Sequence, residues 1–407
     1  MIELIEKLKE EASRCISCGF CESVCPTLPA SGYNLSRGAR GRVILGLELA
    51  KSIKSGTELK LSDSFYSCLD CYACLQVCPA GVNAGLVSHY AKGIIAERGK
   101  GENPFARMIV ETTMRYMNPF GPRERFAEWA RGLKLSERSQ NLLYTGNMYQ
   151  IMEQSRALSK IRRAMGERLS KILAGAVADF PYLIRAGAMF SENDIRARMN
   201  LFLRNIARLL QMAGVDFSYM GSEEPYPGTL IYDLGYLDEF RAYANKVYSM
   251  IKGTGARRVI TVDPHTYDLL KNVYPMFVEG FDLEIVFYTD MLKGLKLSRV
   301  EGIYVFHEPC HLVLHNDYSL PIDMLKSVAE VRLAGRSGKR SRCCGGPAEL
   351  TFPDISEKVS EERYRDLMST GAQYIVTACP ICYINLSKGN NTLDLSEVLI
   401  KAAEGVQ

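Results

Sequence analysis

The sequence predicts an α/β protein in which a mostly helical N-terminal domain precedes two related lobes, each built from a parallel sheet with covering helices. Three observations predict this fold: paired cysteine motifs near the N-terminus, short apolar runs that alternate with helical patterns from Leu142 onward, and an internal repeat. We expect a first domain over residues 1–105, a linker over 106–141, a first lobe over 142–298 with a helical insertion around 155–200, and a second lobe over 299–407.

The N-terminal domain carries one cysteine motif twice. Cys15, Cys18, Cys21 and Cys25 precede Pro26 with the spacing C-x2-C-x2-C-x3-C-P, and Cys68, Cys71, Cys74 and Cys78 precede Pro79 in the same way. In bacterial 4Fe-4S ferredoxins with this spacing, the fourth cysteine of each motif binds the other cluster. We therefore expect two cubane 4Fe-4S clusters, one held by Cys15, Cys18, Cys21 and Cys78, the other by Cys68, Cys71, Cys74 and Cys25. The alternative is a pair of zinc sites, which rarely use three cysteines at successive two-residue gaps.

The segment between the two motifs is longer than in a minimal ferredoxin and shows a helical pattern over Gly41–Ser55, which predicts a mostly helical scaffold. The preceding loop places Arg37, Arg40 and Arg42 beside the cluster sites. These arginines could offset the negative charge of reduced clusters, contact a partner or face solvent.

Five further cysteines lie in the second lobe and complete the total of 13: Cys310, Cys343, Cys344, Cys379 and Cys382. Two adjacent cysteines cannot easily chelate one tetrahedral zinc, because neighbouring side chains diverge, but they can bind different irons of a larger cluster. The set therefore favours an iron-sulfur assembly over a zinc site or an empty structural site.

The second lobe resembles the CCG domain of heterodisulfide reductase catalytic subunits, which also occurs in the iron-sulfur subunits of glycolate oxidase, lactate-utilisation enzymes and anaerobic glycerol-3-phosphate dehydrogenase. The matching segments are His307-Glu308-Pro309-Cys310-His311, Arg342-Cys343-Cys344-Gly345-Gly346-Pro347 and Thr377-Ala378-Cys379-Pro380-Ile381-Cys382-Tyr383. With the twin-cluster segment, the resemblance spans nearly the whole chain. It implies that the five cysteines bind a noncubane 4Fe-4S cluster. His307 and His311 are candidates for proton transfer, or for a supporting role beside the ligands.

An internal repeat relates the two lobes. Gly255–Tyr267 aligns without gaps on Gly371–Tyr383, with Asp263 and Thr266 in place of the two cysteines. The resemblance implies a cysteine where the chain has Asn147, so the first lobe is a degenerate copy, which argues against disulfide reduction. Asp263, His265 and Asn147 either line a small-molecule pocket between the lobes or are vestigial surface residues.

Strands are expected at Thr229–Tyr232, Arg258–Val262, Leu283–Phe287, Ile303–Phe306 and Tyr374–Ala378. Functional groups gather at the carboxyl ends of strands in open parallel sheets. Cys310 and Cys379 follow two of these ends, as a site at that edge of the sheet requires.

Charge and hydropathy limit the partners and the cellular location that we expect for the protein. The formal charge of +4 does not indicate a nucleic-acid partner. The N-terminus lacks the pattern of a signal peptide, and charges and a proline interrupt the least polar stretch, so we expect no membrane span. Apolar positions from Leu158 to Ile172 predict a basic amphipathic helix, which either contacts a membrane through residues 155–190 or packs on its own domain. We expect a cytoplasmic protein, peripheral on the inner face of the cell membrane.

No nucleotide-binding glycine motif occurs in the chain, so we expect FAD only on a partner subunit. The resemblance implies an oxidoreductase: the iron-sulfur electron-transfer subunit of a membrane-associated, flavin-dependent dehydrogenase of the hydroxy-acid or glycerol 3-phosphate class. It would relay electrons from a flavoprotein toward quinone or another acceptor. One alternative is a catalytic subunit that reduces a disulfide, similar to heterodisulfide reductase, and another is a non-redox zinc-binding scaffold.

Overall fold

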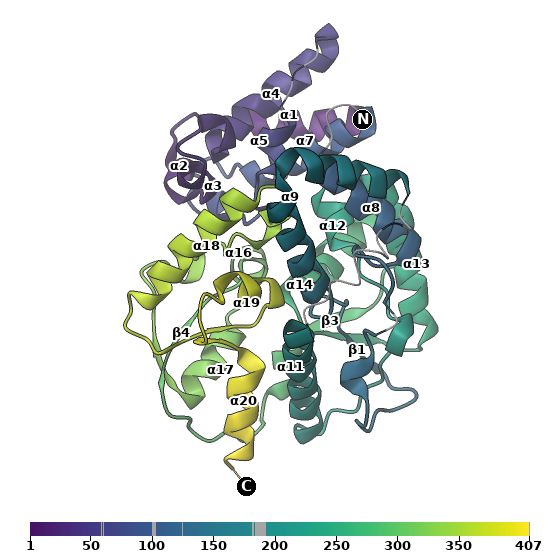
Figure 1. The fold of residues 1–407 in the computed structure, drawn as a ribbon, viewed down its shortest axis with the longest axis vertical. Coiled ribbons are helices and arrows are strands. Elements are labelled where there is room, and N and C mark those ends of the chain that lie inside the picture. The colour runs from purple at the N-terminus through teal and green to yellow at the C-terminus, as the bar shows by residue number, and fades with distance from the viewer. Residues whose placement is uncertain are drawn as a thin grey trace.

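A helical N-terminal domain lies above two sheet-containing lobes (Figure 1). The computed structural model describes residues 1–57, 59, 61–99, 103–123, 125–180, 183 and 193–406. The predicted α/β class is confirmed, as are the parallel sheets. The domain boundaries stay a prediction.

Three helices frame the N-terminal domain: α1 (Ile2–Ser13), α4 (Ala39–Ser55) and α7 (Ala84–Arg98) pack against one another. At Gly46 of α4 a Cβ would lie 2.8 Å from Val87 Cγ1 of α7, so glycine permits the close crossing of these two helices. The helix predicted at Gly41–Ser55 is confirmed by α4. Short helices carry the cysteine loops: α2 (Phe20–Val24), α3 (Thr27–Ala30), η1 (Leu35–Arg37), α5 (Ser62–Tyr66) and α6 (Ala73–Gln76).

The first lobe is built on a three-stranded parallel sheet of order β1-β2-β3, formed by β1 (Asn141–Tyr144), β2 (Arg258–Thr261) and β3 (Glu284–Phe287). Val259 pairs with Leu142 on one side and with Ile285 on the other. Its helices are α11 (Asn193–Met212), η4 (Gly221–Glu223), α12 (Thr229–Asp233), α13 (Leu237–Gly253), α14 (Pro264–Asp268), η5 (Leu269–Val273), α15 (Tyr274–Phe277) and η6 (Tyr288–Leu292).

The second lobe has a four-stranded parallel sheet of order β5-β4-β6-β7, formed by β4 (Ile303–Phe306), β5 (Glu330–Arg332), β6 (Tyr374–Thr377) and β7 (Thr392–Asp394). Val305 of β4 pairs with Ile375 of β6 in the buried centre of the sheet. The accompanying helices are α16 (Cys310–Asn316), α17 (Leu320–Val328), η7 (Gly338–Arg340), η8 (Gly346–Ala348), α18 (Pro353–Met368), α19 (Pro380–Leu386) and α20 (Leu395–Glu404).

Four of the five predicted strands occur within one residue of their expected ends, as β2, β3, β4 and β6. The strand predicted at Thr229–Tyr232 is wrong, because this segment is the short helix α12. Gly228 turns the chain into the helix with φ 91°, and the Tyr226 hydroxyl accepts a hydrogen bond from the Leu230 amide. An apolar run this short does not distinguish a strand from a buried helix.

Two packed helices occupy the region between the N-terminal domain and the lobes. Residues predicted as the start of a linker form part of α8 (Pro104–Tyr116), which packs on α9 (Ile151–Asp179); η2 (Glu128–Ala130) follows α8. Gly166 interrupts α9 with φ 75° and ψ 170°. In the predicted amphipathic helix, Ser155, Ala157, Ser159 and Ser170 are buried, whereas Leu169 and Ile172 are 56% and 62% exposed.

The part of the chain that the structure describes contains no helix with both the length and the apolarity to cross a bilayer. The stretch 155–190, for which we expected a membrane contact, is described up to residue 180 and at residue 183. Residues 181, 182 and 184–190 lie outside the described residues.

Candidate iron-sulfur sites

The first cysteine site lies where the loop between α1 and α2 meets the end of α6. Cys15, Cys18 and Cys21 line one cavity with Cys78, so the structure brings together the four cysteines that the pairing rule predicts. Ser17 and Gly19 have positive φ and turn this loop around the cavity. The Ser17 amide donates to Cys15 Sγ at 3.4 Å, and the Val82 amide donates to Cys78 Sγ at 3.2 Å. Cys18 is exposed, which brings this site to the surface.

A second cavity holds Cys25, Cys68, Cys71 and Cys74, again three cysteines of one motif and the fourth of the other. Burial raises the pKa of Cys74 to about 12, as it raises that of Cys21 in the first site to about 11. These two thiols therefore hold their protons, which a bound metal would displace. That the eight cysteines bind iron stays a prediction.

The three loop arginines have different surroundings. Arg42 is buried, with Nη1 3.8 Å from Cys25 Sγ, and also donates to the Ser64 carbonyl at 2.7 Å. Arg40 lines the first cavity and forms an ion pair with Glu22. Arg37 lies over the Phe352 ring. Arg42 therefore does not face solvent, and its charge adjoins the second cysteine site.

The third site gathers the five remaining cysteines at the carboxyl edge of the second sheet. Cys310 follows β4 and begins α16, whereas Cys379 and Cys382 follow β6 at the start of α19. Cys343 contacts Cys310 and Cys344, Cys344 contacts Cys382, and Cys382 contacts Cys379. The adjacent thiols Cys343 and Cys344 thus face different partners. Hydrogen bonds from Cys343 and Cys382 lower the pKa of Cys344 well below its usual range.

Two glycines after the adjacent cysteines permit this close packing. At Gly346 a Cβ would lie 2.1 Å from Ile381 Cγ2, and at Gly345, where φ is 88°, it would lie 2.5 Å from the Ser356 carbonyl oxygen. Any larger residue would separate the Cys343-Cys344 loop from α18 and α19. The C-C-G-G pattern is therefore a steric requirement of the site.

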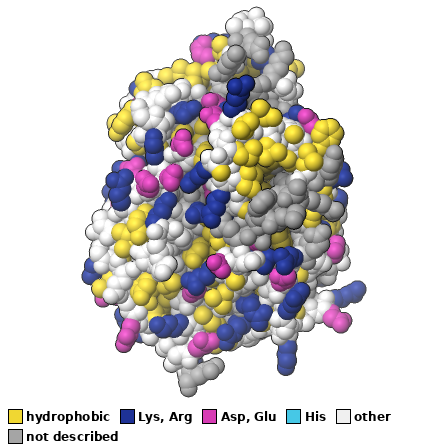
Figure 2. Space-filling view, in the orientation of Figure 1, with side chains coloured by type: hydrophobic (Ala, Val, Ile, Leu, Met, Phe, Trp, Pro, Cys, Tyr) yellow, Lys and Arg dark blue, Asp and Glu magenta, His cyan; other side chains and the backbone are white. Residues whose placement is uncertain are grey.

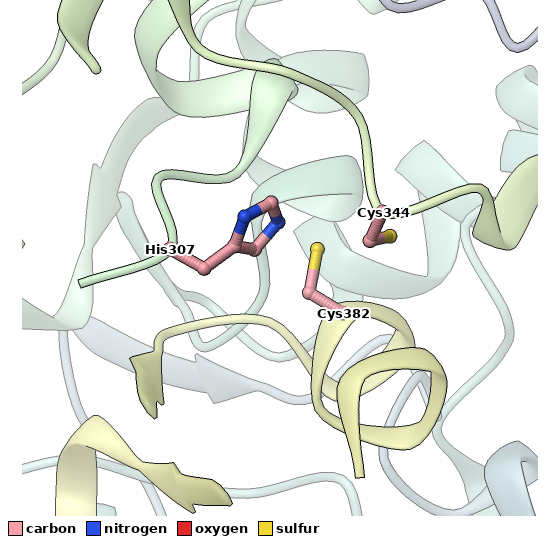
Figure 3. A group of neighbouring side chains, drawn as sticks. All are labelled: His307, Cys344 and Cys382. Carbon is pink, nitrogen blue, oxygen red and sulfur yellow. The ribbon is translucent and has the colours of Figure 1, made fainter. Parts of the chain in front are cut away.

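The candidate His307 lies against the third site. Figure 3 shows its ring facing Cys382 and Cys344, and the ligand atoms of the three residues lie within 4.8 Å of one another. Arg363 Nε donates to His307 Nδ1 at 3.1 Å, which leaves Nε2 for the sulfur atoms. Burial lowers the pKa of His307, so its ring is neutral and carries its hydrogen on Nε2. Such a ring is better suited to donate a hydrogen bond to sulfur than to carry a proton.

The candidate His311 is engaged elsewhere. Its Nδ1 lies 2.8 Å from Asp268 Oδ2, and the Nδ1 of His315 lies 2.7 Å from the same oxygen. Asp268 and His315 were not predicted from the sequence. Two spacings were available as signals: His315 follows His311 by four residues on one helix, and Asp268 follows His265 by three.

The degenerate first lobe keeps the backbone of the repeat. In both copies a parallel strand leads into a helix that begins with proline, at Pro264 and at Pro380. Asp263 Oδ1 caps α14 by accepting from the amides of His265 and Thr266, and Asn147 Nδ2 donates to the Glu224 carbonyl at 2.9 Å. Both side chains are buried, so the suggestion of vestigial surface residues is wrong.

A cleft of about 440 Å³ lies between the N-terminal domain, the first lobe and helix α16 of the second lobe. Its walls are aromatic, with Tyr72, Tyr232 and Phe277, and its lining includes His265, Asp268, His311 and His315. Of the three residues suggested for a pocket between the lobes, His265 thus lines a cleft, whereas Asp263 and Asn147 are held in the hydrogen bonds above.

Comparison with known proteins finds matches for two parts of the chain, and these are the parts that contain the cysteine sites. Residues 11–82 match a 4Fe-4S dicluster domain, and residues 304–387 match a cysteine-rich domain, CCG. With the thiol sites, these matches indicate an iron-sulfur protein, one part of which is similar to a twin-cluster domain and another to a CCG domain. The predicted resemblance is thereby confirmed.

Three relatives indicate the kind of protein this chain is similar to. One subunit of dihydromethanophenazine:CoB--CoM heterodisulfide reductase from Methanosarcina acetivorans is 23% identical over 97% of this chain and 94% of its own length. A probable glycolate oxidase iron-sulfur subunit from Bacillus subtilis is 25% identical over 95% and 91%. An EtfAB:quinone oxidoreductase from Syntrophomonas wolfei is 26% identical over 84% and 47%. The chain spans only 34% to 55% of several longer relatives.

Proposed function

We propose that the chain is the iron-sulfur electron-transfer subunit of a flavin-dependent dehydrogenase, which takes electrons from a separate flavoprotein and passes them toward quinone. In this proposal the first two cysteine sites each hold a cubane 4Fe-4S cluster and the third holds a noncubane 4Fe-4S cluster. Clusters bound there would supply one-electron carriers. The names of the glycolate oxidase subunit and the quinone oxidoreductase support the substrate class and the acceptor.

The observation that carries the proposal is the continuous row of thiol sites from the surface to the interior. The first and second cavities share Ala84 in their lining. Cys71 of the second site packs in one buried cluster with Cys310 and Cys343 of the third, and after burial itself Cys310 raises the pKa of the Cys71 thiol more than any other group does. Three adjoining sites of this kind suit the transfer of electrons from one cluster to the next better than they suit a single catalytic step.

The surface around Cys18 suits contact with a protein that donates electrons. Ile16 and Phe20, on either side of Cys18, are 66% and 60% exposed. Exposed apolar side chains beside a redox site are typical of transient redox interfaces. We therefore assign entry of electrons to the first site and exit to the region of the third.

A disulfide-reducing subunit remains the second candidate, since the heterodisulfide reductase relative matches this chain over nearly its full length. The first lobe weakens this candidate. Asn147, Asp263 and Thr266 stand where the repeat and the resemblance place cysteines, and Asn147 and Asp263 are buried and hydrogen-bonded.

The test is oxidation of the reduced, anaerobically prepared protein by a water-soluble quinone or by a disulfide. We expect the visible absorbance of reduced clusters to recover with the quinone, and to recover at least about tenfold more slowly in Cys310→Ser. Serine keeps the size of the side chain and weakens the ligand. Recovery with disulfides but not with quinones would reverse the ranking.

A further inference from the structure

The group Asp268, His311 and His315 has the chemistry of a metal site separate from the thiol sites. The three residues offer a carboxylate oxygen and two imidazole nitrogens that lie within 4.8 Å of one another. One oxygen, Asp268 Oδ2, lies 2.8 Å from His311 Nδ1 and 2.7 Å from His315 Nδ1. Both ring nitrogens therefore point at the same carboxylate oxygen.

The backbone places these ligands at standard chelating positions. His311 and His315 are four residues apart on α16, so both face the same side of that helix. Asp268 ends α14, which packs against α16. Two helices that follow neighbouring sheets thus supply two histidines and one carboxylate.

The surroundings fix the ligands in the orientation that a metal needs. His315 Nε2 lies 3.0 Å from the carbonyl oxygen of Asp70, an acceptor only, so Nε2 must carry the hydrogen. Nδ1 of His315 then faces Asp268 Oδ2 at 2.7 Å, the length of a hydrogen bond, so a proton joins the two atoms until a metal ion displaces it. A backbone carbonyl on the outer nitrogen is typical of metal-binding histidines.

The carboxylate is held as firmly as the imidazole. Asp268 Oδ1 accepts hydrogen bonds from Asn272 Nδ2 at 2.7 Å and from Asn316 Nδ2 at 2.8 Å, which leaves Oδ2 for the histidines. Tyr72 stacks on the His315 ring at 3.9 Å between centroids, with 10° between the planes. These contacts hold the donors in place before any ion arrives, which lowers the cost of binding.

The fourth position of a tetrahedral site would face the cleft. Asp268, His311 and His315 all line that cleft, as does His265, whose ring lies 4.0 Å from that of His311. Three protein ligands with one open position are the arrangement of a catalytic rather than a structural zinc site.

We propose that Asp268, His311 and His315 bind one divalent ion of the zinc class, with an open coordination position toward the cleft. The ion would act there as a Lewis acid for an oxygen atom of a small molecule. The proposal does not depend on the redox role, because none of the three ligands belongs to a thiol site.

The test is zinc binding by the full-length protein with its iron-sulfur clusters intact. Each sample is washed with a chelator under argon and titrated with Zn²⁺ against a coloured zinc indicator, and its iron is measured in parallel. We expect one tight Zn²⁺ per chain in the parent, and binding at least about tenfold weaker in Asp268→Asn and in His315→Gln. Asp317→Asn, which changes an exposed carboxylate just after α16, is the matched control and should bind like the parent.

Equal zinc binding in the parent and in Asp268→Asn would overturn the proposal, because the ion would then occupy another site. No tight zinc in a parent with full iron content would also overturn it, since protons alone would then hold the three side chains together. Should both variants lose iron, a crystal of the parent measured at the zinc absorption edge decides the question. An anomalous peak within bonding distance of His315 Nδ1 supports the site, and its absence contradicts it.

Discussion

At the scale of single residues, Arg42 shows how the thiol sites and the fold depend on each other. Its guanidinium is buried and donates to neutral groups, the Ser64 carbonyl and the hydroxyls of Thr27 and Ser67. A buried cation is costly unless an anion lies nearby. Cys68 and Cys25 would, as thiolates, stabilise the Arg42 charge more than any other group, ahead of Asp70. Its burial therefore indicates that the second cysteine site is anionic when occupied.

Gly346 provides a steric test of the third site. In Gly346→Ala the new Cβ would meet Ile381 Cγ2 at 2.1 Å, so α19 and the Cys343-Cys344 loop must separate. We expect a loss of stability of about 1–3 kcal/mol and a loss of the iron that the third site holds, with the first two sites still loaded. Iron analysis and visible absorbance measure this.

Gly335→Ala is the control for this substitution, because its Cβ would meet Asp366 at an ordinary 3.8 Å. It should keep all of its iron. If Gly346→Ala also keeps all of its iron, the packing described for the third site is wrong.

Glu224 predicts a dependence of stability on pH. Burial raises the pKa of its carboxyl to about 8, so the folded chain holds a proton that the unfolded chain releases above about pH 4.5. Its contribution to stability therefore falls as pH rises from about 4.5 to about 8, and is level above that. Glu224→Gln removes this fall and should be more stable than the parent at pH 8, by at most ~5 kcal/mol.

The thermal midpoint from circular dichroism between pH 5 and pH 8.5 measures this effect. Glu223→Gln, next in sequence but 80% exposed, should keep the parent profile. A parent and a Glu224→Gln variant with parallel profiles would show that Glu224 is ionised in the folded protein.

Residues that act within a local motif could be predicted from sequence, and those that act through distant partners could not. The spacing of Cys15, Cys18 and Cys21 by itself places them around one site, and the rule for this motif also predicts their pairing with Cys78. By contrast, Asp268 joins His315 from another lobe, and Arg363 reaches His307 from α18. The residues that flank them in the sequence do not indicate such contacts.

At the scale of elements, buried parallel strands were predictable and short edge elements were not. The runs that became β2, β4 and β6 are apolar because both faces of a parallel sheet are covered. The edge strands β5 and β7 have three residues each, too few for a pattern. The helix α12 was predicted as a strand because five residues are too few to show whether apolar side chains recur with the spacing of a helix or of a strand.

The second half of α9 tests the expected contact with a membrane. Leu169, Ile172 and Leu173 are exposed here, and Figure 2 shows apolar side chains gathered over this part of the helix. We expect the protein to float with liposomes rich in anionic lipid. Replacing all three residues by serine should reduce the floating fraction at least about tenfold, since each loses ~1.5 kcal/mol or more of apolar transfer energy.

Met276→Ser is the control, because Met276 is 63% exposed but lies on α15. It should float like the parent. If the parent stays with the soluble fraction at low salt, α9 makes no membrane contact and its apolar side chains serve another purpose.

At the scale of the whole molecule, the fold converts two separate cysteine-rich segments into one row of sites. The N-terminal domain sets its second site against the third through Cys71 and Cys310, more than two hundred residues apart in sequence. Gln76 of α6 also donates to the Leu314 carbonyl of α16 across this boundary. The two segments that match known domains therefore pack against each other at their cysteine sites.

Metal analysis of anaerobically prepared protein tests this account most directly. We predict a brown protein with about twelve irons and a matching amount of acid-labile sulfide per chain. Cys310→Ser should lower the iron of the third site while the spectra of the two cubane clusters persist. A colourless protein, with zinc in place of iron at the cysteine sites, would contradict the account.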